Sequence, residues 1–262
     1  MAASLDNFTV IVTGGAGGLG KAIAVAFLAA GSNVAVCDVS APRIAEISAE
    51  WESAHAGKFL ASQADITDEA ASKAFVDSVV AKFGKLDMLV NNAGVMDSYD
   101  PVGSTDKAVW DRVIGVNVTG LFLMTKAAVN VMAAAGGGTI INIGSVAGYR
   151  GLCAGAAYTA SKHAIIGLTK STAGYYGDKG VYSIVLLLGA MESTNIVDAF
   201  SKAPPNQESM ALSNTVNPGM VPGKTTVPLA DVAKYCIFFA DRSVAHASNG
   251  STVTVNKNWP AA

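Results

Sequence analysis

A glycine-rich loop between an apolar segment and a helix most constrains what this chain can fold into. The loop, TGGAGGLG, occupies residues 13–20. It follows an apolar segment from Phe8 to Thr13 that is typical of a buried strand, and we expect a helix over residues 18–30. A strand, a glycine-rich loop and a helix in this order indicate an α/β fold with a phosphate-binding site at the helix N-terminus.

The glycines of this loop have different tasks. Gly14 permits the tight turn, Gly18 lets the backbone approach a phosphate closely, and Gly20 lets the helix pack on the strand. Glycine is common in turns of every kind, so the loop alone is weak evidence. The strand and helix on either side strengthen it.

Six more apolar segments predict the rest of the sheet. The segment Val181 to Leu188 is apolar without a break, which is the pattern of a strand buried on both faces. We therefore expect a single Rossmann-type, doubly wound α/β domain over residues 1–262, with about seven parallel strands and helices on both faces. The other five expected strands are Asn33–Cys37, Lys58–Ala64, Leu86–Val90, Thr139–Ile143 and Ser251–Val255.

The segments between the strands predict helices. A long helix is expected from Asp106 to Ala134, and Gly115 and Gly120 in its interior are poor helix formers. They indicate close packing or a local distortion near Asn117. The remaining helices are expected to end near Ala56, Phe83, Tyr176 and Ala240.

Composition limits the kinds of partner. Hydrophobic residues make up 51% of the chain and charged residues only 15%, against a usual charged share of about 25%. We attribute the apolar surplus to a covered parallel sheet and to subunit interfaces. The formal net charge is −2 with no basic block, which argues against a nucleic acid or an anionic membrane as a partner.

The cysteines and the N-terminus predict a cytoplasmic location. Cys37, Cys153 and Cys236 are odd in number and widely spaced, as expected for reduced thiols of an intracellular protein. The N-terminus lacks the basic and apolar regions of a secretory signal. The apolar run around Ile184–Leu188 is far shorter than the roughly 20 residues of a membrane span.

The histidines predict no metal site. His55, His163 and His246 are scattered without the spacing of metal ligands. We therefore expect no bound metal.

A tyrosine and a lysine four residues apart suggest acid/base chemistry. On a helix, Tyr158 and Lys162 share a face, so the ammonium group can lie beside the phenol. A nearby positive charge favours the phenolate, and we expect it to lower the pKa of Tyr158 and make it a usable general acid and base. Ser145 ends an expected strand, and its hydroxyl can donate to a carbonyl oxygen held near Tyr158. Such a pair is common on helices, so further motifs must support it.

Two of those motifs lie earlier in the chain. Asn91-Asn92-Ala93-Gly94 follows an expected strand, and Asn117 lies on the long helix before Ser145. With the glycine-rich loop and the Tyr158–Lys162 pair, the chain resembles the short-chain dehydrogenase/reductase family. The likeness covers nearly the whole chain, and its motifs occur in the family's order.

The resemblance implies roles for these residues. Tyr158 would be the catalytic acid and base, and Lys162 would activate it and bind the nicotinamide ribose. Ser145 would orient the substrate, and Asn117 would support a water molecule in a proton relay. The resemblance also implies assembly through the long helices and the last strand into a homo-oligomer, with a tetramer favoured and a dimer as the alternative.

The sequence favours NAD as the cofactor. Asp38 ends the second expected strand, where a carboxylate can accept hydrogen bonds from the ribose hydroxyls and repel a 2′-phosphate. Members of the family that use NADP often have a basic residue at the positions of Ala16, Gly17 or Val39, and this chain has none there. Arg43 is the nearest basic side chain.

The resemblance completes the expected cofactor site. Asp65 would contact the amino group of the adenine, Asn92 and its neighbours would lie under the cofactor, and Thr194 would bind the carboxamide. Asn91 is expected to join neighbouring strands. The full expected set is Gly14, Gly18, Leu19, Gly20, Asp38, Asp65, Ile66, Asn92, Ala93, Gly94, Tyr158, Lys162, Gly189, Met191 and Thr194.

The chain departs from the family at three places. The usual Pro-Gly after the sixth strand is Leu188-Gly189, and an Asn earlier in that strand is Ile184. The usual Asp-Gly-Gly after the last strand is Asn256-Lys257-Asn258. Asn217-Pro218-Gly219 resembles the missing motif but lies too far along the chain, and we treat it as chance. The catalytic residues are unchanged, so the departures concern the nicotinamide edge and the subunit packing.

A long segment near the C-terminus suggests a lid over the substrate. Residues 190–226 have no clear periodicity, contain four prolines and are much longer than an ordinary connection. A loop of this length at the edge of a parallel sheet is a candidate lid. We expect a mainly apolar substrate pocket with one polar contact, formed by Met96, Tyr149, Leu152, Cys153, Met191 and Glu192.

These features predict a function. We expect reversible hydride transfer between NAD and a small, largely apolar secondary alcohol or ketone. Two alternatives stay open. One is a dinucleotide-binding protein with a regulatory or scaffolding role, and the other is proton chemistry without redox, such as isomerisation or dehydration.

Overall fold

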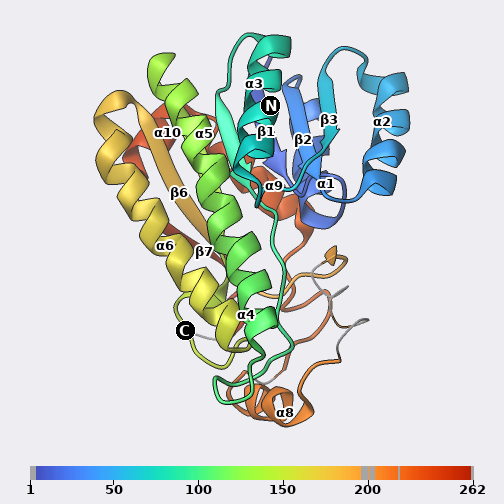
Figure 1. Cartoon of the computed structure of the whole chain (residues 1–262), viewed down its shortest axis with the longest axis vertical. Helices are drawn as coiled ribbons and strands as arrows, with labels where there is room; N and C mark the ends of the chain where they lie inside the picture. Colours follow the sequence, from blue (N-terminus) through green and yellow to red (C-terminus); the bar gives the residue numbers. More distant parts are fainter. Residues whose placement is uncertain (1–3, 196–199, 201–203, 218, 261–262) are drawn as a thin grey trace.

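A parallel sheet of seven strands forms the centre of the computed structural model, which describes residues 4–195, 200, 204–217 and 219–260. The order of the strands in the sheet is β3-β2-β1-β4-β5-β6-β7, and every neighbouring pair is parallel. This topology confirms the predicted Rossmann-type fold (Figure 1). The strands are β1 (Thr9–Thr13), β2 (Asn33–Asp38), β3 (Phe59–Gln63), β4 (Met88–Asn91), β5 (Gly138–Ile143), β6 (Val181–Leu188) and β7 (Thr252–Val255).

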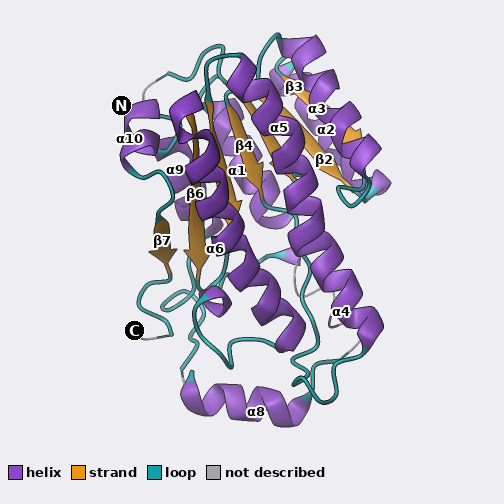
Figure 2. Cartoon of the chain, turned by 60° about the vertical axis from the view of Figure 1, so that its left-hand side comes forward, coloured by secondary structure: helices purple, strands orange, loops and turns teal. Residues whose placement is uncertain are grey.

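The helices lie on the two faces of this sheet, except α8, which lies beyond its lower end (Figure 2). Their bounds are α1 (Gly18–Ala29), α2 (Ala41–His55), α3 (Glu69–Phe83), α4 (Lys107–Ile114), α5 (Leu121–Ala134), α6 (Ala156–Tyr176), α8 (Gln207–Val216), α9 (Leu229–Phe238) and α10 (Arg242–Ala247). Two short 3₁₀ turns, Val146–Gly148 and Gly177–Lys179, follow β5 and α6.

Alternate residues of each strand supply the cores on the two faces. In β1, Val10 and Val12 pack with α1, α2 and α9, whereas Ile11 packs with α3 and α5 on the other face. Successive side chains of a strand point to opposite sides, so a strand covered on both faces must be apolar throughout. All five residues of β1 and seven of the eight of β6 are buried, which explains the unbroken apolar runs in the sequence.

The strand order determines where a ligand can bind. From β1 the chain first builds outward through β2 to β3 and then returns to place β4 on the other side of β1. The loops that follow β1 and β4 therefore diverge at the carboxyl ends of two adjacent strands. Open α/β sheets bind their ligands in the crevice that forms there.

The structure corrects several of the predicted helices. The long helix is divided at Gly115–Gly120 by a π-helical segment that contains Asn117, which confirms the expected distortion. The segment 190–226 was predicted without regular structure, yet it contains α8, and residues 196–199, 201–203 and 218 of it lie outside the described part. The helix expected to end near Ala240 ends at Phe238, and α10 follows it.

Helix α8 is joined to two distant loops. The backbone N–H of Asn206, the N-cap residue of α8, donates to the carbonyl oxygen of Ser98 (2.8 Å). At the other end, Asn217 Nδ2 and the Ser213 hydroxyl both donate to the carbonyl oxygen of Leu152 (3.0 and 2.5 Å). Asn217 thus has its own structural task, and α8 covers the loops that precede α4 and α6.

The helical stretch Lys107–Ala134, which comprises α4, the π-helical segment and α5, is long and apolar enough to cross a membrane, with a mean hydropathy of 1.3 in its most apolar part. A core helix of a soluble protein has the same properties. Here its buried side chains Met124 and Met132 pack in the core on the sheet. Its Lys126 forms an ion pair with Glu69 of α3 (2.7 Å).

Candidate active site

The glycine-rich loop forms the floor of the site. The N–H groups of Gly14 and Gly15 donate to the carbonyl oxygen of Cys37 at 2.8 and 3.2 Å, and Gly14 and Gly18 have positive φ angles of 61° and 50°. A Cβ atom at Gly20 would overlap the carbonyl oxygen of Gly14, so only glycine allows α1 to lie this close to the turn. The tasks assigned to Gly14 and Gly20 from the sequence agree with this geometry.

The start of α1 can receive an anion. Gly17 is its N-cap, and no side chain of the described residues caps it there. The first amides of a helix lack partners within the helix and lie at the positive end of its dipole. A phosphate bound at Gly17 and Gly18 would supply the missing acceptors.

Asn92 holds the loop after β4 against the glycine-rich loop. Its Nδ2 donates to the carbonyl oxygens of Thr13 (2.9 Å) and Gly14 (3.2 Å). The Thr13 hydroxyl in turn accepts from the backbone N–H groups of Asn92 and Ala93, both at 3.0 Å. These four bonds join the carboxyl ends of β1 and β4 into one surface.

Asn91 has a different task, in agreement with the sequence. Its Nδ2 donates to Asn142 Oδ1 of β5 and to the Thr125 hydroxyl of α5, both at 2.9 Å. Asn91 therefore joins two strands and a helix and does not face the crevice.

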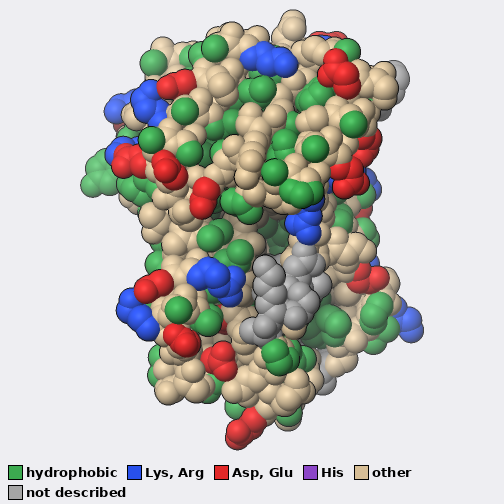
Figure 3. Space-filling model, turned by 45° about the vertical axis from the view of Figure 1, so that its right-hand side comes forward, with side chains coloured by type: hydrophobic (Ala, Val, Ile, Leu, Met, Phe, Trp, Pro, Cys, Tyr) green, Lys and Arg blue, Asp and Glu red, His purple; other side chains and the backbone are tan. Residues whose placement is uncertain are grey.

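A cavity of about 310 Å³ extends along this surface. The space-filling view shows the molecule hollowed across the middle of one face, with Lys and Arg side chains beside the hollow (Figure 3). The cavity contains most of the expected cofactor residues. Those lining it are Gly14, Gly18, Leu19, Asp38, Asp65, Ile66, Asn92, Ala93, Gly94, Tyr158, Lys162, Met191 and Thr194.

Two expected cofactor residues, Gly20 and Gly189, do not line the cavity. Gly20 lies behind the turn, as described above. A Cβ atom at Gly189 would lie 2.8 Å from the Cβ of Asn256, so this glycine serves the packing of the segment after β7. In that segment Lys257 and Asn258 have positive φ angles of 51° and 55°, at the places where the family usually has glycine.

Sequence reasoning missed other residues of the cavity. Val95, Val116, Ile143, Gly144 and Asn195 also line it. A Cβ atom at Gly17 would overlap Asn195 Nδ2, so the start of the segment 190–226 lies directly on the glycine-rich loop. These residues lie beside the motifs without being part of them, and no pattern in the sequence distinguishes them.

Acidic side chains end two strands at the edge of the cavity. Asp38 is the last residue of β2, and its Oδ1 accepts a hydrogen bond from the Ser40 N–H at 3.0 Å. Asp65 lies after β3, and its Oδ1 accepts from the N–H and the hydroxyl of Thr67. Asp68, and not Asp65, caps α3. Asp65 lines the cavity, and its Oδ1 is already bonded to Thr67.

Tyr158, Lys162 and Ser145 come together as predicted. Lys162 Nζ lies 5.3 Å from the centre of the Tyr158 ring and donates to the carbonyl oxygen of Ile143 at 2.9 Å. The side chains of Ser145 and Tyr158 are hydrogen-bonded, and the Ser145 hydroxyl also accepts from the Ala147 N–H. Tyr158 and Lys162 of α6 therefore line the cavity, and Ser145, which follows β5, is not a lining residue but is bonded to Tyr158.

Burial reverses one electrostatic expectation. Tyr158 is 7% exposed, and burial raises its pKa more than the hydrogen bond from Ser145 lowers it. Lys162 is 3% exposed, and burial lowers its pKa from 10.5 to about 8. The predicted lowering of the Tyr158 pKa is wrong for this structure, because loss of hydration disfavours the phenolate and the ammonium alike.

Asn117 is fully engaged in structural contacts. Its Oδ1 accepts from the Val95 N–H (2.8 Å), and its Nδ2 donates to the Val95 carbonyl oxygen (2.9 Å) and the Ser161 hydroxyl (3.0 Å). The side chain thus holds the loop after β4 against α6. A role in a water relay would use its backbone, not its side chain.

The expected substrate pocket is only partly assembled. Met96 and Cys153 pack with Tyr158 in a small apolar cluster, whereas Tyr149 and Leu152 are each 43% exposed. The carboxylate of Glu192 accepts from Gly223 N–H and the Thr226 hydroxyl, so it joins the two ends of the segment 190–226. Residues of the cluster that the sequence did not indicate include Tyr99, Trp110 and Phe200.

Within the described residues, no three His, Cys, Asp or Glu side chains are grouped as metal ligands. The ring of His163 interacts with the carbonyl oxygen of Thr159 (2.9 Å), one turn earlier on α6. Cys37, Cys153 and Cys236 are free thiols.

Comparisons with known proteins agree with this geometry. The family model described as short chain dehydrogenase matches residues 8–204. The chain is 41% identical over 261 residues to the short chain dehydrogenase/reductase dpfgG of Gibberella zeae, covering 98% of this chain and 95% of that protein. It is 34% identical to 3beta-hydroxysteroid dehydrogenase 2 of Eggerthella lenta, covering 98% and 96%. The crystal structure of levodione reductase matches with a TM-score of 0.83 and 30% identity over 97% of each chain.

The chain therefore belongs to the short-chain dehydrogenase/reductase family. Members of this family are oxidoreductases that use a nicotinamide cofactor and act on small molecules. The fold, the glycine-rich loop and the side chains at the end of the cavity all conform to that class.

The lowered pKa of Lys162 predicts a pH-dependent stability. Between pH 8 and 10.5 the unfolded chain keeps the Lys162 proton that the folded chain has released, so this group makes the folded state more stable as the pH rises. Lys162→Met removes that contribution. We expect the stability of the variant relative to the unmodified protein to decrease across this window, by on the order of 3 kcal/mol at most.

Thermal unfolding followed by circular dichroism at several pH values measures the effect. Lys170→Met is the matched control, because Lys170 is exposed on the same helix. The stability difference between Lys170→Met and the unmodified protein should stay constant with pH. The lost hydrogen bond to Ile143 adds only a constant offset, so a pH-independent difference for Lys162→Met would contradict the assignment.

Proposed function

We propose that this protein is an NAD-dependent oxidoreductase that transfers hydride between the nicotinamide and a secondary alcohol or ketone. The observation that supports this most directly is the position of Ser145, Tyr158 and Lys162. Tyr158 and Lys162 line a cavity whose other walls include a glycine-rich turn, a helix N-terminus and the carboxylates of Asp38 and Asp65, and Ser145 is hydrogen-bonded to Tyr158. A dinucleotide requires these features in this arrangement.

The residues present fit the cofactor. Gly17 and Gly18 line the cavity at the start of α1, where a helix N-terminus would hold a pyrophosphate. Asp38 and Asp65 line it beyond β2 and β3 and would bind the adenosine. Lys162 lines it beside Tyr158 and would bind the nicotinamide ribose. When bound, the cofactor supplies or accepts the hydride. The protein supplies the binding surface and the proton.

Tyr158 is the proton donor in this proposal. Its hydroxyl gives a proton to the carbonyl oxygen during reduction and takes one from the alcohol during oxidation. Ser145 holds that oxygen by a second hydrogen bond, and the Lys162 ammonium stabilises negative charge on the phenol. Because burial raises its pKa, Tyr158 stays protonated at neutral pH, which favours reduction there.

The substrate proposed is largely apolar. The cluster around Tyr158 contains Met96, Tyr99, Cys153 and Phe200, whose side chains offer mainly apolar surface. The similarity to levodione reductase and to a 3beta-hydroxysteroid dehydrogenase supports a reductase or dehydrogenase. A small ketone with an apolar body fits both observations.

The Tyr158→Phe substitution tests the chemistry. It removes only the hydroxyl, so NADH binding should stay nearly intact while turnover falls by a factor on the order of 100 or more. Lys162→Ala should weaken both, since it removes a ribose contact and a charge. Tyr175→Phe is the control, because Tyr175 is 80% exposed on the same helix.

The measurement is NADH oxidation with a panel of apolar ketones and NAD reduction with secondary alcohols. Undiminished activity of Tyr158→Phe would disprove its role. Tight NADH binding without turnover by the unmodified protein would favour a regulatory or scaffolding protein, and conversion of a substrate without cofactor oxidation would favour proton chemistry alone.

Cofactor choice is tested at Asp38. We expect the unmodified protein to bind NADH more tightly than NADPH, because the Asp38 carboxylate repels a 2′-phosphate. Asp38→Ala should narrow the difference, which titration calorimetry with both dinucleotides can measure. Arg43 lines the same cavity, so Arg43→Ala shows whether that guanidinium attracts a 2′-phosphate. Equal or tighter binding of NADPH by the unmodified protein would refute the choice of NAD.

We also propose a homo-oligomer, with a tetramer favoured. Large apolar side chains are exposed on three helices, namely Phe122 of α5 (45%), Tyr175 of α6 (80%) and Phe238 of α9 (56%). Subunit interfaces are enriched in aromatic side chains, so these helices are candidate contact surfaces. Light scattering at micromolar concentration should give the mass of four chains, and the mass of one chain would contradict this proposal.

A further inference from the structure

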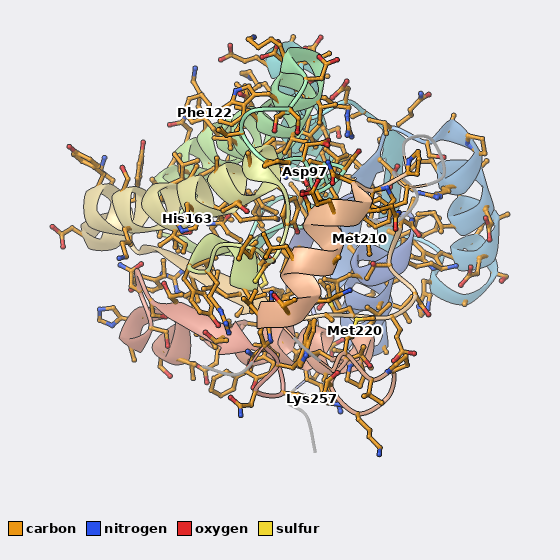
Figure 4. The ribbon with its side chains drawn as sticks, turned by 90° about the horizontal axis from the view of Figure 1, so that it is seen from below. Asp97, Phe122, His163, Met210, Met220 and Lys257 are labelled. Carbon is orange, nitrogen blue, oxygen red and sulfur yellow. The ribbon has the colours of Figure 1, made fainter. Side chains whose placement is uncertain are left out.

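We propose that Asp97 is a positioning residue that fixes Tyr158 and the adjoining wall of the substrate site together. The inference rests on the proposed function, because it assigns Asp97 a part in the same reaction. Asp97 is 1% exposed and lies in the loop between β4 and α4. Seen from below, it lies near the middle of the molecule, close to α8 (Figure 4).

The carboxylate of Asp97 accepts three hydrogen bonds from backbone amides. Oδ2 accepts from the N–H of Tyr158 (2.8 Å), and Oδ1 accepts from the N–H groups of Gly155 (3.0 Å) and Tyr99 (3.2 Å). A buried ionised group needs partners of this kind, and hydrogen bonds to a charged acceptor are about twice as strong as neutral ones. Asp97 and Gly155 are 58 residues apart in the sequence, so the carboxylate joins two distant segments.

Two of the three amides, those of Gly155 and Tyr158, lie at the N-terminal end of α6. Gly155 is the N-cap of α6 and forms no side-chain cap of its own within the described chain. Asp97 supplies the cap instead, and its negative charge lies at the positive end of the helix dipole. Because Tyr158 is the third residue of α6, the cap holds the backbone of the proposed proton donor directly. A Cβ atom at Gly155 would lie 2.6 Å from Asp97 Oδ2, so glycine is required for this contact.

The third amide holds a strained residue. Tyr99 has a φ angle of 64°, a left-handed conformation that costs a bulky residue about 1–2 kcal/mol. Its N–H bond to Asp97 stabilises that turn. The Tyr99 ring packs in the cluster that contains Tyr158 and lies 6.1 Å from the ring of Phe200. One carboxylate therefore fixes the backbone position of the proposed proton donor, Tyr158, and that of the neighbouring aromatic residue Tyr99.

Asp97 also affects the charge at Tyr158. The groups that face the phenol are Asp97, Tyr99, Ser145 and Lys162; the first two raise its pKa, and the hydrogen bond from Ser145 lowers it. Removal of the Asp97 charge should therefore make Tyr158 easier to ionise. A residue with a purely structural role elsewhere in the loop would not change this ionisation.

The Asp97→Asn substitution is the first test. An amide has only one acceptor oxygen, so it cannot serve the amides on both sides of the carboxylate. We expect NADH affinity to change less than threefold and kcat to fall about tenfold or more, which is about 1.4 kcal/mol in the barrier. The ionisation of Tyr158 should move to lower pH, because the Asp97 charge is one of the groups that raise its pKa. It is followed by tyrosinate absorbance, with Tyr158→Phe protein as the reference.

The matched control is Asp100→Asn. Asp100 lies in the same loop, is half-buried, and its side chain accepts a long hydrogen bond (3.4 Å) from Asn206. The Asp100→Asn substitution should leave the pH of Tyr158 ionisation and the value of kcat nearly unchanged. An equal effect of the two substitutions, or an unchanged Tyr158 ionisation in Asp97→Asn, would overturn the proposal.

Gly155→Ala tests the same contact if Asp97→Asn does not fold. The added methyl group displaces the carboxylate from the Tyr158 amide but keeps its charge, so kcat should fall while the ionisation of Tyr158 moves less. An unchanged kcat would overturn the proposal. The absorbance titration of Tyr158 does not need turnover. If the unmodified protein has no redox activity, the proposed function is refuted, and the titration still shows whether Asp97 affects the ionisation of Tyr158.

Discussion

The close contact between the glycine-rich loop and the segment after β4 is the constraint on which the rest of the site depends. A Cβ atom at Gly14 would lie 3.0 Å from the Cα of Ala93, and one at Gly20 would lie 2.6 Å from Asn92 Nδ2. The hydrogen bonds of Asn92 and Thr13 close this contact. Larger residues would separate the two strand ends, and the cavity between them would lose its floor.

Buried polar groups determine how the site is held. Lys162 and Asp97 are each almost fully buried, and each is satisfied mainly by backbone groups, namely the carbonyl oxygen of Ile143 and three amides. Asn117 likewise bonds to both backbone groups of Val95. Backbone partners have little conformational freedom, so these side chains fix the geometry between β5, α6 and the loop after β4. The same burial sets the direction of the pKa changes at Tyr158 and Lys162.

The segment 190–226 is attached at both of its ends. Glu192 binds Gly223 and Thr226, which brings the ends together, and α8 bonds to loops near Ser98 and Leu152. Asn195 lies on the glycine-rich loop. The described parts of this segment therefore contact the glycine-rich loop and the loops that precede α4 and α6.

The amino-acid sequence was enough to predict the strands, the glycine-rich turn, and Ser145, Tyr158 and Lys162 as residues of the site. These features follow from local rules: apolar runs predict strands, glycine permits the turn, and residues four apart share a helix face. Tyr158, Lys162 and Ser145 were identified in this way. The tertiary structure alone decided that Tyr158 has a raised pKa, that Glu192 closes a loop, that α8 exists, and that Asp97 caps α6. Each of these depends on burial or on contacts between segments distant in the sequence, and no local pattern contains that information.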